Sequence, residues 1–244
     1  MTLSHCFDTI LLLARPAAGK SEIIDFLKKT PPEQRLEKFH IGQMTEFDDF
    51  PILWGWFEED AILEKMGYPR LHSDSDGYFL GNHHWDVLIE RLSLEYQKWL
   101  RDRSHDGQCH TAIIEFSRGS EHDGYQKAFQ HLSPEVASQC AILYVNVSWE
   151  ESLRKNRRRF NPDRPDSILE HGLEDEKMEF LYREVDWHQV SSPHPEFIEI
   201  QGYQVPYVVF ENEDDVTTQK GEALESRLNT SLNKLWDLFQ KSHS

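Results

Sequence analysis

The stretch Thr9 to Leu27, TILLLARPAAGKSEIIDFL, decides the fold. It opens with an apolar run that favours a β-strand, residues 10–13, and continues through a loop of small residues, ARPAAG, at 14–19. Lys20 and Ser21 then begin a segment whose apolar residues recur at helical spacing. A strand, a small-residue loop, Lys-Ser and a helix follow one another in this order in phosphate-binding loops.

The residue types of this loop suit an anion. Backbone N–H groups that face a phosphate need small side chains around them, and the helix that follows adds the partial positive charge of its N-terminus. Lys20 would reach the β- and γ-phosphates of a nucleotide, and the Ser21 hydroxyl would ligate Mg²⁺. We therefore expect nucleotide phosphates to bind a continuous segment, Ala14, Arg15, Pro16, Ala17, Ala18, Gly19, Lys20 and Ser21.

One position departs from the consensus G-x-x-x-x-G-K-[ST], because its first glycine is Ala14 here. Alanine does not freely adopt a positive φ. The motif therefore requires that Ala14 have a negative φ, and a positive value would mean that the match is accidental.

Composition sets further limits. The chain has 244 residues, enough for one sizeable α/β domain, and a formal net charge of −17, which argues against general nucleic-acid or anionic-membrane binding. It contains no apolar run long enough to span a membrane and no signal peptide at its N-terminus. Its three cysteines show no CxxC spacing. These features predict a cytoplasmic protein without a membrane span.

Apolar runs that favour strands alternate with segments that favour helices along the chain, which predicts a parallel sheet covered by helices on both faces. We expect a three-layer α/β fold with about five strands, in one domain over residues 1–244. The expected strands are 10–13, 39–43 (ending near 48), 111–116, 141–147 and 205–210. Because ligands bind outside the carboxyl ends of parallel strands, polar residues that follow these strands should meet at one edge.

Acidic residues follow two of the expected strands. Asp48 would take a proton from a substrate hydroxyl or hold a water on Mg²⁺, and Asp49 would contact the substrate. The alternative for this pair is a solvated turn. Glu115 ends an apolar strand, where burial of a carboxylate is costly unless a cation is near, so we expect it to hold Mg²⁺ through water. Its alternative is an ordinary carboxylate facing solvent.

Basic residues are concentrated in one helix. Five of the six residues from 154 to 159 are Lys or Arg, and helical spacing places Arg154 on one face with Arg158. Guanidinium groups match phosphate oxygens, so we expect at least one of these arginines to neutralise charge on a transferred phosphoryl group. Arg118 would bind substrate phosphate or hold Asp48, with a surface salt bridge as the equal alternative. Asn212 lies in the loop after the last strand, whose backbone groups would contact an adenine edge, with a solvated acidic loop as the equal alternative.

These motifs together resemble the P-loop kinases of small molecules, the group that includes nucleoside and nucleotide kinases. ARPAAGKS at 14–21 is similar to their GxPGxGKS loop, and DDF at 48–50 is similar to the DDF motif of uridine and nicotinamide riboside kinases. IIEF at 113–116 resembles their acid-ending strand, YVNVSWEESLRKNRRR at 144–159 resembles their helical lid with its arginines, and VVFEN at 208–212 resembles the segment before the adenine loop. The departures are Ala14 and Ala17 in place of glycines.

The resemblance implies an ATP-dependent, Mg²⁺-assisted kinase with Lys20, Asp48, Arg154 and Arg158 as catalytic residues. Its acceptor-binding insert would span about 48–82, with Trp54 or Trp56 as a stacking surface and Arg70 as an anion contact, and its lid would span about 150–190. The acceptor would be a nucleoside, a nucleotide or a related metabolite. One alternative is a nucleotide-binding regulatory protein without kinase turnover. Another, a polynucleotide end kinase, needs a basic channel that the net charge disfavours.

Overall fold

The computed structural model describes residues 5–103, 107–159 and 172–243. A six-stranded sheet in the order β2-β3-β1-β4-β6-β5 forms the centre of the fold. Neighbouring strands are parallel except at one edge, where β5 runs antiparallel to β6. The strands are β1 (Thr9–Ala14), β2 (Gln43–Asp48), β3 (His110–Phe116), β4 (Cys140–Asn146), β5 (Phe197–Ile200) and β6 (Tyr203–Glu211).

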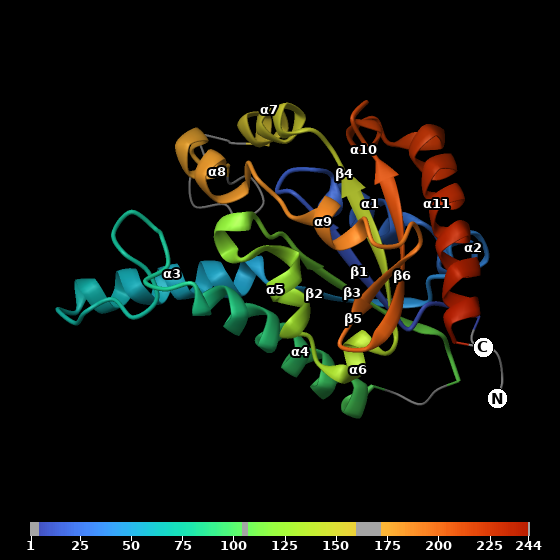
Figure 1. Ribbon diagram of the computed structural model, residues 1–244, viewed down its shortest axis with the longest axis horizontal. Helices are drawn as coiled ribbons and strands as arrows, with labels where there is room; N and C mark the ends of the chain where they lie inside the picture. Colours follow the sequence, from blue (N-terminus) through green and yellow to red (C-terminus); the bar gives the residue numbers. More distant parts are fainter. Residues whose placement is uncertain (1–4, 104–106, 160–171, 244) are drawn as a thin grey trace.

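The helices are distributed over both faces of this sheet and around its edges (Figure 1). They are α1 (Lys20–Lys29), α2 (Pro32–Phe39), α3 (Phe50–Lys65), α4 (His83–Asp102), α5 (Gly124–Gln130), α6 (Pro134–Ala137), α7 (Trp149–Arg159), α8 (Asp175–Tyr182), α9 (Trp187–Ser191), α10 (Val216–Gln219) and α11 (Gly221–Ser242), with a short 3₁₀ turn η1 (Ser120–His122). No helix among the described residues is long and apolar enough to cross a bilayer.

Side chains of β1 alternate between two cores, as successive residues of a strand must. Ile10 and Leu12 pack with apolar residues of α1 and α11, whereas Leu11 and Leu13 pack with those of α4 and α5. All six residues of β1 are buried. The expected three-layer architecture is therefore confirmed as a mixed α/β fold, with β1 in the middle of the sheet.

The strand count differs from the expected five. The extra strand, β5, is only four residues long and is joined to β6 by a tight turn in which Gln201 and Gly202 both have positive φ, 51° and 85°. Two such residues form a hairpin turn whose twist matches that of the strands. β2 also lies further along the chain than residues 39–43, because this edge strand has few buried residues and therefore a weak apolar signal.

Two segments expected to carry function lie differently against this core. α3 and the loop that follows it extend away from the sheet (Figure 1). Residues 160–171 of the expected lid are outside the described residues. Trp187, near the end of the expected lid, is buried and its ring stacks on Tyr144 of β4 at 3.9 Å, so this part belongs to the core.

Candidate active site

A cavity of about 360 Å³ lies at the carboxyl edge of the central strands. Residues 16–21, which join β1 to α1, form one wall, and the ends of β2 and β3 form another. The other charged residues that line it are Asp48, Asp49, Glu115, Arg118, Lys155, Arg158 and Arg159, with Glu22 at the start of α1. The sheet therefore brings the predicted loop and the predicted acids to one place.

Strand register explains why the two acids meet. Asp48 of β2 pairs with Glu115 of β3, and Glu115 pairs on its other side with Leu12 of β1. Both carboxylates thus lie at the same level of the sheet, directly below the loop that follows β1. This juxtaposition follows from parallel pairing of strands that end in acids.

The loop itself is fixed by bonds to its carbonyl groups. The Ser152 hydroxyl donates to the Pro16 carbonyl at 2.8 Å, and the Asn212 amide donates to the Ala18 carbonyl at 2.8 Å. Gly19 has a φ of 117°, and a Cβ at this position would lie 2.5 Å from the Thr217 hydroxyl oxygen. The two hydrogen bonds occupy carbonyl oxygens that would otherwise repel an anion. The close approach of the Thr217 side chain leaves room only for glycine at position 19.

The two alanines that replace consensus glycines behave differently. Ala14 is the last residue of β1 and has no positive φ, so the condition for a genuine loop is met. Its carbonyl accepts a hydrogen bond from the Tyr125 hydroxyl at 3.0 Å. Ala17 has a φ of 57°, a region that costs an L-residue about 1 kcal/mol or more. The loop therefore adopts a glycine-like conformation at a position that lacks glycine.

Among the basic residues that act on the two strand-end acids, Lys20 has the largest effect. Its Nζ donates to the Ser117 hydroxyl at 2.8 Å, and its charge lowers the pKa of both Glu115 and Asp48. Burial has the opposite and larger effect, and the Asp49 charge raises the pKa of both acids further. The pKa of Glu115 consequently rises to about 7 and that of Asp48 to about 6. At neutral pH, Glu115 is therefore only partly ionised, and additional positive charge in the cavity would favour its ionised form.

Arg118 forms a buried ion pair with the second acid of the DDF segment. It is 1% exposed, and its Nη1 lies 2.7 Å from an Asp49 carboxylate oxygen. The guanidinium also lies 5.2 Å from the centre of the Trp85 ring and donates to the Trp85 carbonyl at 3.1 Å. Of the sequence alternatives, Arg118 therefore holds an acid, but that acid is Asp49 and not Asp48, and the pair is not on the surface.

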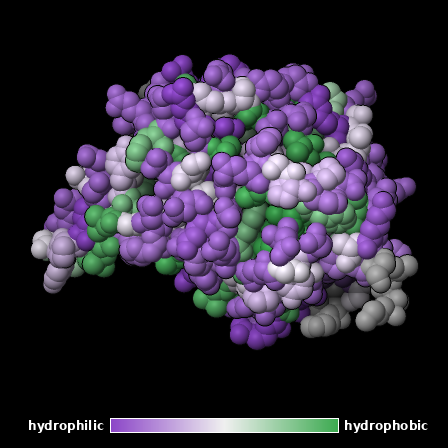
Figure 2. Space-filling model, in the orientation of Figure 1, coloured by the Kyte–Doolittle hydropathy of each residue, from purple (hydrophilic) through white to green (hydrophobic). Residues whose placement is uncertain are grey.

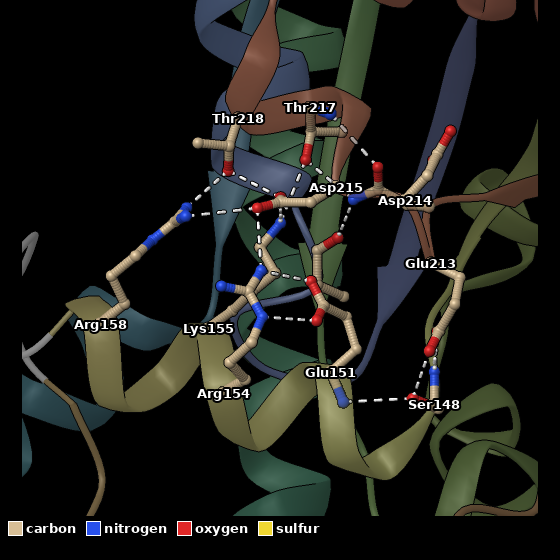
Figure 3. A network of polar contacts seen from close by, with 12 residues as sticks. Ser148, Glu151, Arg154, Lys155, Arg158, Glu213, Asp214, Asp215, Thr217 and Thr218 are labelled. Carbon is tan, nitrogen blue, oxygen red and sulfur yellow. Dashed lines mark hydrogen bonds and ion pairs between the residues drawn. The ribbon is translucent and has the colours of Figure 1, made fainter.

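The basic helix is organised around one carboxylate. Figure 3 shows Arg154, Lys155 and Arg158 of α7 pointing toward Asp215, with N–O distances of 3.0, 2.7 and 3.4 Å. Arg154 is also bonded to Glu151 and does not line the cavity, whereas Arg158 does. Lys155 lines it as well and is 3% exposed. Sequence reasoning chose the arginines of this run and missed this lysine, which helical spacing alone does not distinguish.

Other predicted residues lie both inside and outside the cavity. Ser21 lines it, as expected of a metal-binding hydroxyl, but Asn212 is fully buried and bonded to Ala18 and Thr217. The Asn212 side chain therefore supports the loop and is not among the residues that line the cavity. The Arg15 guanidinium donates to the carbonyls of Tyr182, Val147 and Arg183, so it links the loop to the end of α8 and is not among the residues that line the cavity.

The predicted acceptor residues Trp54 and Arg70 are separated. Trp54 lines a second cavity next to the first. Trp56 lines neither cavity and stacks on His72 at 5.0 Å. Arg70 donates to Glu64 at 3.0 Å and to the Ser73 carbonyl at 2.8 Å and lines neither cavity, so its role as an anion contact is not supported.

Magnesium is the metal that the loop implies, and its donor set can be checked against the described residues. Mg²⁺ prefers oxygen ligands and is held in many nucleotide sites by one or two protein groups together with substrate phosphates. Ser21 supplies a hydroxyl, and Glu115 supplies a carboxylate that burial keeps partly protonated. These groups line the same cavity as the loop, so they fit a magnesium ion that accompanies phosphate.

Comparisons with known proteins do not assign a family. No family of related sequences matches this chain, and no curated protein matches it. The crystal structure of an unliganded sugar kinase from Janibacter sp. is similar over 95% of this chain and 98% of that one, with a TM-score of 0.40 and 13% identity. A de novo designed P-loop fold protein is similar over 95% of both chains, with a TM-score of 0.29 and 12% identity. Scores this low establish no activity, so the function must be inferred from the cavity.

Proposed function

We propose that this protein transfers the terminal phosphoryl group of ATP to a small-molecule acceptor. The observation that carries the proposal is the common cavity of the 16–21 loop, Lys20, Asp48 and Glu115. A phosphate-binding loop alone would suit any nucleotide-binding protein. A second strand-end acid beside it adds a group that can accept a proton from an attacking hydroxyl.

Each residue has a role in this proposal. Backbone N–H groups of the loop and the Lys20 ammonium bind the phosphates, and Arg158 or Lys155 of α7 neutralises charge on the group in transfer. Ser21 and Glu115 would hold Mg²⁺, which when bound neutralises phosphate charge. Asp48 orients the acceptor hydroxyl and takes its proton, and a pKa of about 6 leaves it mostly ionised at neutral pH. Asp49 and Arg118 hold the acid-bearing segment in place.

The test is turnover of ATP with a panel of nucleosides, nucleotides and sugars, with phosphorylated products identified by mass spectrometry. Asp48→Asn should lower kcat by about 10²- to 10⁴-fold for the best acceptor while leaving ATP binding intact. Glu59→Gln on the exposed side of α3 is the matched control and should not change kcat. ATP binding without any phosphorylated product would instead favour the nucleotide-binding regulatory protein.

A further inference from the structure

A second cavity of about 640 Å³ adjoins the phosphate-binding cavity. Five residues line both cavities: Phe50, Leu53, Trp85, Leu173 and Tyr182. The two cavities are therefore direct neighbours with a common wall. Asp48 lies two residues before the shared Phe50. A molecule in the second cavity would therefore have one end near the proposed proton acceptor.

Aromatic rings form most of the walls of this second cavity. Phe50, Trp54 and Phe57 come from α3, and Tyr78 and Phe79 come from the loop after it. The Phe79 ring lies 5.6 Å from that of Phe57 and 4.8 Å from that of Trp85. Planar guests gain stacking and edge contacts with such walls, whereas a sugar would bury its hydroxyls in a described lining where polar side chains are few, namely Asn82, Glu121, His122 and Lys177.

One polar group on these walls has no partner. His122 is 3% exposed, and its ring lies 3.7 Å from the Trp85 ring. The Gly119 N–H donates to His122 Nδ1 at 3.3 Å, so in the neutral ring the proton resides on Nε2. Burial and the nearby Arg118 charge lower the pKa of His122 well below its usual value, which keeps the ring neutral. Among the described residues, none accepts a hydrogen bond from Nε2.

One wall of the second cavity is formed where α8 contacts the 66–82 loop. Lys177 Nζ lies 4.9 Å from the centre of the Tyr78 ring and donates to the Asp76 carbonyl. The Phe180 ring meets the Tyr78 ring edge-on at 5.8 Å. The space between α3 and α8 is therefore a lined cavity with aromatic groups on both sides and not an open surface.

We propose that the acceptor is a planar aromatic or heteroaromatic alcohol, which carries a carbonyl oxygen or ring nitrogen that accepts a hydrogen bond from His122 Nε2. This inference rests on the proposed phosphoryl transfer. The acceptor's hydroxyl oxygen bonds to the γ-phosphorus, the bond from that phosphorus to the β–γ bridging oxygen breaks, and ADP leaves. The hydroxyl proton passes to Asp48. His122 selects the acceptor and takes no part in the bond changes.

The test uses matched probes of similar size. Quinoline-3-methanol has a flat ring system and a ring nitrogen, naphthalene-2-methanol has the ring system alone, and ribose has neither. Binding is measured by isothermal titration without ATP, and product formation is measured separately with Mg·ATP. We expect quinoline-3-methanol to bind about tenfold more tightly than naphthalene-2-methanol, since one hydrogen bond is at stake, and ribose to bind least.

Two variants test the role of His122. His122→Phe keeps a ring against Trp85 but removes the donor, so it should abolish the preference for quinoline-3-methanol over naphthalene-2-methanol. His122→Gln places an amide donor near the position of Nε2 and should retain most of that preference. The unfolding temperature of each variant shows whether the fold survives, and the wild-type comparison of the three probes stands independently of both.

The outcomes separate this inference from the proposed function. If ribose binds and is phosphorylated as well as quinoline-3-methanol, the aromatic acceptor is wrong and phosphoryl transfer stands. If the aromatic probes bind in a manner that depends on His122 but no product forms with Mg·ATP, the cavity assignment stands and the kinase proposal fails. If none of the aromatic probes binds, or if wild type binds both equally, the inference is overturned.

Discussion

The two cavities are neighbours, but they are built in different ways. The proposed phosphate-binding cavity is formed at the ends of β1, β2 and β3, and these strands are embedded in two apolar cores. The aromatic cavity is formed by α3, the 66–82 loop with the start of α4, η1 and α8. Of the sixteen residues of α3, only Asp60 is buried, although the helix is rich in apolar side chains.

The outer region is held by local hydrogen bonds instead of a core. The fully buried Asp60 carboxylate accepts N–H bonds from Leu71, His72 and Ser73, two of them 2.6 Å long. Exposed apolar residues remain there, including Ile62 and Met66 at 57% and 63% exposure, and Figure 2 shows apolar atoms on this projecting part. If phosphoryl transfer is the function, the nucleotide would bind on the side supported by two cores, and the acceptor would bind on the side with fewer buried residues.

Hydrogen exchange should show the largest difference between the two regions. Amides of α3 should exchange roughly a thousandfold faster than those of β1, because opening α3 exposes little buried apolar surface. A ligand in the aromatic cavity should slow exchange in α3 and leave β1 unchanged. If the amides of α3 and β1 were equally protected from exchange in the free protein, the proposed difference in stability between the two regions would be wrong.

Arg118 contacts both regions, since it pairs with Asp49 and lies against Trp85. Arg118→Met should lower the free energy of unfolding by about 3 kcal/mol, because it leaves a buried carboxylate without its cation. Urea unfolding measures the loss, and adding Asp49→Leu should recover part of it. Arg101→Met, which breaks an exposed ion pair with Asp102, is the control and should have no measurable effect.

The stability of the phosphate-binding side should depend on pH. Burial raises the pKa of Glu115 from 4.5 to about 7, so the folded state binds this proton more tightly than the unfolded state does. The corresponding stability is complete below pH 4.5 and is lost as the pH rises through 7. The charged groups that act on Glu115 are Lys20, which opposes the shift, and Asp48, Asp49 and Glu46, which add to it.

Glu115→Gln isolates this contribution. Without divalent cations, the variant should match wild type near pH 4.5 and exceed its free energy of unfolding by roughly 3 kcal/mol at pH 8. Asp48, whose pKa rises to about 6, acts in the same direction, and because its charge also raises the pKa of Glu115, the difference reports the two interacting carboxyl groups together. A gap that is constant between pH 4.5 and 8 would show that Glu115 does not titrate as described.

The smallest expected effect comes from the loop conformation. Ala17→Gly should raise the free energy of unfolding by up to about 1 kcal/mol, because relief of the strained φ exceeds the added freedom of the unfolded chain. The neighbouring Ala18 has no positive φ and is 1% exposed, so Ala18→Gly should destabilise the protein. Thermal unfolding of the Ala17→Gly and Ala18→Gly variants tests this prediction. If Ala17→Gly lowers the unfolding temperature, the backbone at Ala17 is not strained.

Sequence correctly predicted that the 16–21 segment and the strand-end acids meet, because this arrangement follows from local rules. One contiguous motif places Lys20 and Ser21, and acids at the ends of neighbouring parallel strands must meet. Asp48 and Glu115 were found in this way. The sequence did not predict the partner of Arg118. Asp48 and Asp49 are adjacent, and nothing in the sequence shows which of them contacts a distant arginine.

The aromatic cavity could not be read in the same way. Its residues come from four separate segments, and no spacing relates Trp54 to His122 or to Phe180. The role of Asn212 was also missed, because a polar residue after a strand looks the same whether it meets a ligand or supports a loop carbonyl. Burial alone distinguishes the two, and burial depends on the assembled fold.

The central claim is that the 16–21 loop and Lys20 bind the phosphates of Mg·ATP. Isothermal titration with Mg·ATP tests it most directly, with Lys20→Met compared against Lys28→Met, an exposed lysine of the same helix. We predict one Mg·ATP bound per chain, at least tenfold weaker binding in Lys20→Met, and unchanged binding in Lys28→Met. Absence of binding to the wild-type protein, or equal binding by both variants, would contradict the account.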